Sequence, residues 1–188
     1  MGDSMAAAPT LMTIDDYFAT PESLAPTELA FGVLRVADSP SARHQSVVLD
    51  LLIALEHHVR EKKLGRMWVS PLDVVLDAEK ALVVQPDLMF VSNERSSIVS
   101  DRVRGAPDLM VEVLSPSLRV GRVAEHLDWF ARYGVRECWH VHRDEQRVSV
   151  IGFDRGKVRS RRIAGADQPI PSDVLPGFGL SLRGILEH

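Results

Sequence analysis

Apolar residues recur every three or four positions between His44 and Lys63, which is the spacing of one face of an amphipathic helix. This pattern predicts a helix of about 20 residues that ends near Gly65. A second amphipathic helix is expected from about Gly121 to Tyr133, and Gly134 is well placed to close it in a left-handed conformation. The apolar positions of the first helix are Val47, Val48, Leu51, Leu52, Leu55 and Val59.

Strand-like segments have a different pattern, in which short apolar runs alternate with turn residues. Met67–Leu76 and Leu82–Val91 are rich in β-branched residues, and the polar residues 77–80 between them predict a hairpin. Asp108–Leu114 is short, apolar and bounded by prolines, so it is expected to be a buried strand. The other expected elements are short helices at 13–19 and 181–187, two strands within Glu28–Val36, a strand at Glu137–Val141, and a hairpin of Arg147–Phe153 with Lys157–Ile163.

The order strand, helix, strand between Asp108 and Val141 predicts a parallel crossover. The predicted fold class is therefore α/β, with a central mixed β-sheet flanked by helices. No repeat or internal boundary interrupts the pattern, which predicts one domain over residues 11–188 after a flexible tail at 1–10. Leu186–His188 has the composition either of a native end or of a tag remnant.

Composition narrows the class of protein. The chain has 188 residues, of which 45% are hydrophobic and 26% charged, as in a globular domain with an apolar core. No apolar run approaches the roughly 20 residues needed to cross a bilayer, and no secretory signal is present, so a cytoplasmic location and no membrane contact are expected. The single cysteine, Cys138, cannot form an intramolecular disulfide.

The net charge of −4 argues against a protein that coats nucleic acid without specificity, because phosphates are usually neutralised by a basic surface. A local basic strand is the exception. In a strand, Arg155, Lys157, Arg159 and Arg161 would project to one side as a candidate nucleic-acid-binding surface. The alternative is a solvated edge strand whose charges prevent aggregation.

Two carboxylates are placed where they suggest chemistry. Asp87 begins an apolar strand, and Glu112 lies in the middle of another, where a buried carboxylate is costly unless a cation compensates it. Carboxylates on neighbouring strands can hold Mg²⁺ or Mn²⁺, and such an ion can activate water against a phosphodiester. The alternative is that Glu112 pairs with an arginine and that Asp87 has no chemical role.

Six segments carry a further signal, and in order along the chain they are Glu28–Leu34, Ser39–His44, Gln85–Val91, Pro107–Ser117, Tyr133–Trp139 and Leu175–Leu182. Each is a modest signal alone, but together they extend over about residues 11 to 185. In this order they resemble the segments of the Uma-two family of restriction-endonuclease-like proteins.

This resemblance implies a restriction endonuclease-like core and metal-dependent cleavage of nucleic acid, with DNA as the first expectation. It implies that Asp87 and Glu112 are the metal ligands and catalytic carboxylates. Glu28 and His44 match further polar positions that the family places near the same pocket, as accessory residues. By analogy with nucleases that act on duplexes, a homodimer is also expected.

The catalytic lysine of such nucleases is missing from its expected positions. The residue two after Glu112 is Leu114, and the helix position from which the family commonly supplies its lysine holds His126, with Arg122 one turn earlier. His126 can transfer protons near neutral pH, whereas a guanidinium does not readily do so. Two readings follow: a nuclease in which His126 is catalytic, or an inactive nucleic-acid-binding or interaction protein that retains the fold.

A zinc site is a weaker alternative. Cys138, His140 and His142 alternate along the predicted strand, but three ligands on one strand rarely converge on one ion. The favoured expectation is that His140 and His142 line a partly exposed strand while Trp139 and Val141 pack inward.

Overall fold

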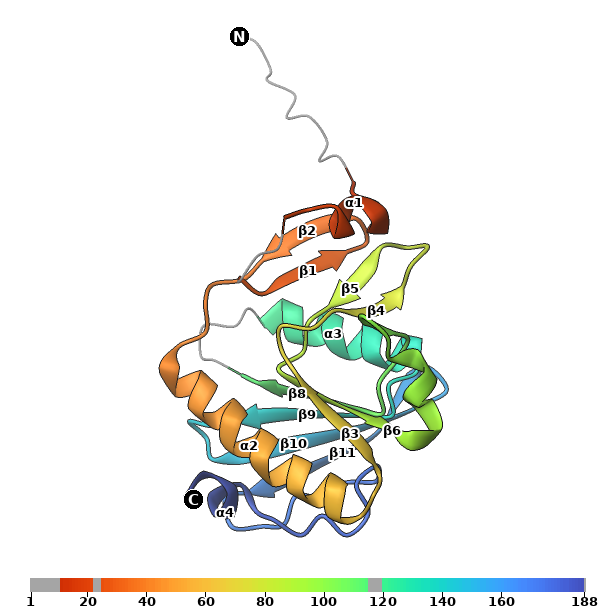
Figure 1. Ribbon diagram of the computed structural model, residues 1–188. Helices are drawn as coiled ribbons and strands as arrows, with labels where there is room; N and C mark the ends of the chain where they lie inside the picture. The colour runs from red at the N-terminus through yellow and green to blue at the C-terminus, as the bar shows by residue number, and fades with distance from the viewer. Residues whose placement is uncertain (1–10, 22–24, 115–119, 188) are drawn as a thin grey trace.

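In the parts of the chain that the structure describes, two mixed β-sheets form the centre and helices flank them (Figure 1). The computed structural model describes residues 11–21, 25–114 and 120–187. The expected tail at 1–10, Ser115–Ser117 of the family motif and His188 lie outside these residues. The strands are β1 (Thr27–Ala30), β2 (Val33–Val36), β3 (Gly65–Val69), β4 (Val74–Asp77), β5 (Leu82–Val84), β6 (Leu88–Ser92), β7 (Val103–Arg104), β8 (Leu109–Val113), β9 (Glu137–His142), β10 (Arg147–Asp154) and β11 (Lys157–Gly165).

One sheet has the order β2-β1-β5-β4-β7 and the other the order β11-β10-β9-β8-β6-β3. Only β4 with β7 and β8 with β9 pair in parallel among the described strands. The predicted α/β class with a mixed sheet is confirmed, although the strands divide between two sheets. The parallel crossover from β8 to β9 is also confirmed.

The helices are α1 (Ile14–Phe18), α2 (Ala42–Glu61), α3 (Val120–Tyr133) and α4 (Leu182–Leu186), with a 3-10 helix, η1 (Asn93–Ile98). Helix α2 begins two residues before its predicted start because the Ser41 side chain accepts a hydrogen bond from the His44 backbone and caps it. Its apolar side packs on one face of the six-stranded sheet. Helix α3 lies between the two sheets and packs on the opposite face (Figure 1).

The predicted hairpin of Met67–Leu76 with Leu82–Val91 is present, but each strand is divided in two. The first becomes β3 and β4 and the second becomes β5 and β6, so the hairpin passes from one sheet to the other. Pro71 and Pro86 lie at the two breaks, where a residue without an N–H cannot donate to the ladder. Asp87 therefore lies just outside β6, next to the junction between the sheets.

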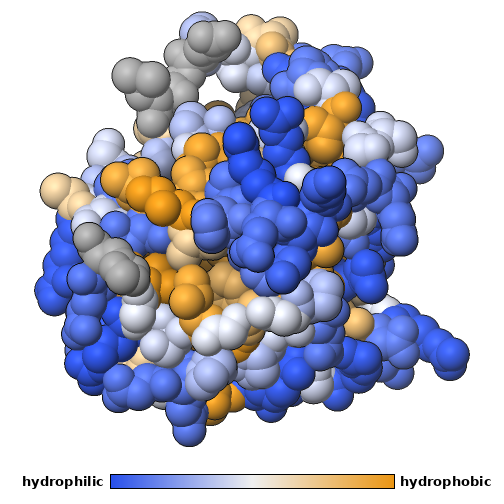
Figure 2. Space-filling view, turned by 60° about the horizontal axis from the view of Figure 1, so that its bottom comes forward, coloured by the Kyte–Doolittle hydropathy of each residue, from blue (hydrophilic) through white to orange (hydrophobic). Residues whose placement is uncertain are grey.

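The expected loop at 92–106 contains η1 and the short strand β7. At the end of α3, Gly134 adopts a φ of 93°, as predicted for a left-handed closing residue. Most apolar side chains are buried, and the face drawn in Figure 2 shows exposed apolar residues among hydrophilic ones. No described helix is long and apolar enough to span a membrane.

Candidate active site

Glu112 lies on β8, which runs between β6 and β9 in the interior of the six-stranded sheet. Leu109, Val111 and Val113 of this strand pack in the core under α2, and Met110 packs in the core beside α3. Because side chains alternate along a strand, Glu112 points toward α3 with Met110. Its carboxylate is buried, with a residue exposure of 8%. A buried carboxylate needs compensating charge, and α3 supplies it.

His126 on α3 lies between two carboxylates from different sheets. Its Nδ1 is 2.6 Å from Oε1 of Glu112, and its Nε2 is 2.9 Å from Oε1 of Glu28 on β1. The first contact is a hydrogen bond, and the second is an ion pair whose angle is less favourable. Both ring nitrogens face acceptors, so the geometry favours the doubly protonated imidazolium.

Burial alone would lower the pKa of His126, but the charge and hydrogen bond of Glu112, together with Glu28, raise it to about 10. Burial likewise opposes the ionisation of Glu112, yet His126 and His140 hold the pKa of that carboxyl well below its usual range. At neutral pH the site therefore contains an ionised Glu112 and a positively charged His126.

His140 is a site residue whose position sequence reasoning missed. It is opposite Glu112 in the parallel pairing of β8 and β9, and its Nε2 is 3.4 Å from Oε2 of Glu112. The expectation that it lies on a partly exposed strand is wrong, because it is 4% exposed on a strand with neighbours on both sides. His142, at the end of that strand, is half-buried as expected.

Asp87 forms a second carboxylate–histidine pair beside the first. Its Oδ1 is 3.0 Å from Nε2 of His44, in the first turn of α2, and its Oδ2 accepts a 2.7 Å hydrogen bond from the Val113 backbone. Strands β6 and β8 are paired as far as Leu88 opposite Val111, so the same register continued by one residue sets Asp87 opposite Glu112. Hydrogen bonding to Asp87 raises the pKa of His44 against the opposing effect of burial.

The donor chemistry at this place fits a hard divalent cation with two protein ligands. Asp87 and Glu112 contribute carboxylate oxygens from adjacent strands, and an oxygen that accepts one hydrogen bond retains a second lone pair. Oε2 of Glu28 is also buried without a hydrogen-bond partner. A complete cage is not formed, since no group of three His, Cys, Asp or Glu residues able to hold a metal occurs within the described ranges. The zinc alternative therefore gains no support.

The remaining predicted accessory residue, Arg122, is half-buried one turn before His126. Its positive charge contributes to the lowered pKa of the Glu125 carboxyl, after the larger effect of a hydrogen bond from Arg35. Arg35 also lies over the Trp129 ring, 5.7 Å from its centroid. Positive charge is thus available at the α3 side of the site.

The predicted basic strand is β11, but its cations do not share one face. A bulge in the pairing of β10 with β11 lies at Arg159 and shifts the alternation, so Lys157 is opposite Asp154 and Arg161 is opposite Ile151. Ile151 and Asp154 are three residues apart on β10, so they face opposite sides of the sheet. Their partners on β11, Arg161 and Lys157, therefore also face opposite sides. Arg155 lies in the turn. Their role in binding nucleic acid stays a prediction.

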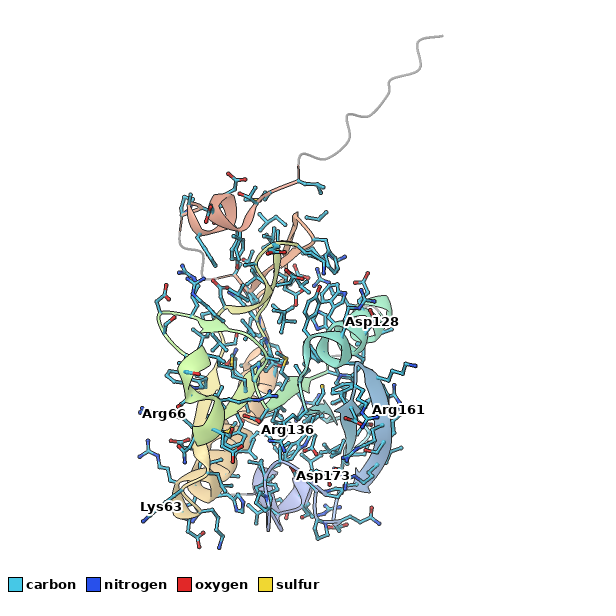
Figure 3. All side chains as sticks on the ribbon, turned by 90° about the vertical axis from the view of Figure 1, so that its right-hand side faces the viewer. Lys63, Arg66, Asp128, Arg136, Arg161 and Asp173 are labelled. Atoms are coloured by element: carbon cyan, nitrogen blue, oxygen red, sulfur yellow. The ribbon has the colours of Figure 1, made fainter. Side chains whose placement is uncertain are left out.

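Arg159 forms an ion pair with Asp173, so its guanidinium is less available to a phosphate. Figure 3 shows Arg161 on the outer side of the sheet, on the far side of the molecule from Arg66. This separation follows from the strand order, in which β11 and β3 are the two edges of the six-stranded sheet.

Comparisons with known proteins agree with the fold. The model of the Uma2 family, described as "Putative restriction endonuclease", matches residues 14–183. The crystal structure of a "putative nuclease belonging to DUF820" from Anabaena variabilis superposes with a TM-score of 0.78 at 18% identity, covering 94% of this chain and 98% of that one. No curated protein sequence matches. The restriction-endonuclease-like fold predicted from the sequence is confirmed.

Proposed function

Because this chain belongs to the Uma2 family, we propose that it is a metal-dependent nuclease that hydrolyses phosphodiester bonds in nucleic acid, and in DNA first. The observation that carries the proposal is the adjacency of Asp87 and Glu112, together with the placement of His126 against Glu112. Two acidic ligands can hold a metal ion that activates water, and a neighbouring cation can stabilise the charge that develops when a phosphodiester is hydrolysed.

In this proposal Asp87 and Glu112 hold Mg²⁺ or Mn²⁺. The ion would supply an activated water and stabilise the leaving oxygen. His126 keeps its proton between Glu28 and Glu112, so it offsets part of their negative charge and holds Glu112 in place. Arg122, one helical turn away, adds a positive group for the phosphate. His44 fixes one oxygen of Asp87.

A specific observation favours a second candidate, a nucleic-acid-binding protein without hydrolysis. His126 is in contact with two carboxylates, which hold its pKa at about 10. A group with this pKa is a weak base near neutral pH, and it cannot accept a proton from water while both nitrogens are protonated. The loss of the lysine would then have left a binding site with the nuclease fold.

The expected cytoplasmic location and homodimer belong to the same proposal. Apolar side chains exposed on β2 and α2 offer surface that a second copy can cover, among them Val33, Val36, Leu49 and Ile53. A molecular mass of about twice that of the chain, measured by light scattering, would support the homodimer.

The deciding experiment incubates the purified protein with single- and double-stranded DNA and with RNA, with and without Mn²⁺. We expect Mn²⁺-dependent cleavage of DNA that Asp87→Ala abolishes. A Mn²⁺-dependent rise in melting temperature, absent in Asp87→Ala, would report the metal site independently of turnover. Binding of DNA without cleavage above the Asp87→Ala level would exclude the nuclease and support the second candidate.

A further inference from the structure

A separate groove lies at the opposite end of β6 from Asp87, where α2 ends and β3 begins. Its volume is about 620 Å³, which is within the range of small-molecule sites. We call it the α2–β3 groove. The polar and aromatic residues that matter for its binding properties are Glu56, Arg60, Arg66, Trp68, Ser92 and Asn93.

The charge balance of the groove leaves one cation in excess. Arg60 pairs with Glu56, and the second oxygen of Glu56 accepts a hydrogen bond from the Met67 backbone at 3.3 Å. Arg66 is exposed on β3 and has no ion pair with any described residue. Its guanidinium lies 5.7 Å from the centroid of the Trp68 ring, which supports the group without using its N–H donors. A phosphate matches such a planar set of donors.

Among the polar groups of the residues that line the groove, the Trp68 indole can only donate a hydrogen bond, whereas the hydroxyl of Ser92 and the amide of Asn93 can both donate and accept. The indole N–H of Trp68 and the hydroxyl of Ser92 are buried and have no hydrogen-bond partner among the described residues. The Asn93 side chain is fixed by a 2.8 Å hydrogen bond from its amide nitrogen to the Lys63 carbonyl. The one carboxylate, Glu56, is already neutralised. This arrangement favours a ligand that brings negatively charged oxygens.

Spacing along the fold relates the groove to the candidate active site. From Asp87 to Ser92 the chain advances five residues along β6, or about 17 Å. From His44 to Arg60 it advances 16 residues along α2, or about 24 Å. Successive phosphates of one DNA strand are about 3.4 Å apart along the axis, so these lengths correspond to about five to seven nucleotides.

We propose that the α2–β3 groove binds a phosphate of the polynucleotide strand that is held at Asp87 and Glu112, about five to seven nucleotides from that site. Arg66 is the main contact. The inference rests on the proposed function, which places the strand at Asp87 and Glu112. It assigns the phosphate contact to β3, which is at the other edge of the six-stranded sheet from β11. Figure 3 shows Arg66 and Lys63 together on this side of the molecule.

The test measures binding of labelled double-stranded DNA by fluorescence anisotropy, with Asp87 and Glu112 intact and Mn²⁺ left out so that cleavage does not occur. Arg66→Gln should weaken binding of a duplex of about 16 base pairs by about tenfold and lower the salt dependence by about one counterion. Binding of a short oligonucleotide that folds into a hairpin of about four base pairs should not change, because its duplex cannot reach both places. Arg66→Lys should retain part of the affinity, since it keeps the charge but loses the planar fork.

Lys62→Gln is the matched control, because Lys62 is an exposed cation of the same segment that pairs with Glu61 and does not line the groove. Equal losses from Arg66→Gln and Lys62→Gln would reduce the effect to net charge and overturn the proposal. Arg66-dependent binding of a mononucleotide, or an equal loss with the short oligonucleotide, would instead identify a site for a free phosphate compound. Failure of the wild type to cleave DNA would remove the nuclease function but leave these binding outcomes readable.

Discussion

The two carboxylate–histidine pairs of the site differ in how completely the protein encloses them. The side chains of Glu112 and His126 are each 11% exposed, and Glu28 and His140 complete their surroundings. The side chains of Asp87 and His44 are 25% and 16% exposed, and the only further contact of the Asp87 carboxylate among the described residues is the Val113 backbone. The first pair is part of the protein interior, whereas the second is at its boundary with solvent.

This difference in enclosure indicates different roles for the two pairs, although the sequence predicted Asp87 and Glu112 together as one pair of metal ligands. An enclosed ion pair interacts strongly because little water screens it, and its partners are hard to exchange. A half-exposed pair is screened and can exchange a partner for an incoming ligand. We infer that Glu112 and His126 form the fixed electrostatic part of the site, and that Asp87 with His44 is the part that adapts to metal or substrate.

The largest expected effect is on stability. Glu112→Gln leaves the buried charge of His126 with Glu28 alone, and breaking a buried pair in this way costs about 3 kcal/mol. Asp87→Asn, the matched change at the more exposed pair, should cost about 1 kcal/mol or less. Urea denaturation monitored by circular dichroism measures both free energies of unfolding. Equal costs would show that enclosure does not distinguish the two pairs.

Much of the fold could be predicted from the sequence where local patterns decide it. The apolar spacing of Val47, Leu51 and Leu55 predicted α2, and Gly134 predicted the end of α3. The division of the hairpin was missed, because the apolar residues on both sides of each break fit the pattern of one continuous strand. Pro71 and Pro86 were the available signals, since a proline interrupts a central strand.

The candidate site was predictable only in part, because strand register and helix placement are set by tertiary packing. Glu112 was identified as a carboxylate in an apolar run. Its contact with His140 depends on the parallel register of β8 with β9, and the contact of Glu28 with His126 depends on α3 lying between the sheets. No local sequence pattern predicts either arrangement. The bulge at Arg159 likewise has no local signal in the alternating cations.

The next largest effect tests whether His126 limits turnover. His126→Lys places a lysine where the resemblance to the family leads us to expect one, and it keeps a cation between Glu28 and Glu112. We expect Mn²⁺-dependent cleavage of DNA to rise by at least about tenfold, as general acid–base groups commonly contribute more than this. His126→Gln fits the same place without charge and should give no gain. If the lysine and glutamine variants cleave equally, the fixed cation has no part in catalysis.

The smallest effect, taken per pH unit, concerns the pH dependence of stability, which should differ between the two histidines. The pKa of His126 is raised from its ordinary 6.5 to about 10, so its stabilising contribution is complete below pH 6.5 and is lost as the pH rises through about 10. Glu112 has a lowered pKa, so its contribution is present above its ordinary 4.5 and is lost as the pH falls through the lowered value. Between these limits the pair contributes fully, and above pH 6.5 the free energy of unfolding should fall by at most about 1.4 kcal/mol per pH unit.

Urea titrations at several pH values between 6.5 and 9.5 should show a flatter decline in the free energy of unfolding for His126→Gln than for the wild type. His44→Gln should change the slope less, because that pair is more exposed and more strongly screened. If His44→Gln flattens the decline more than His126→Gln does, the assignment of the fixed charge to α3 is wrong.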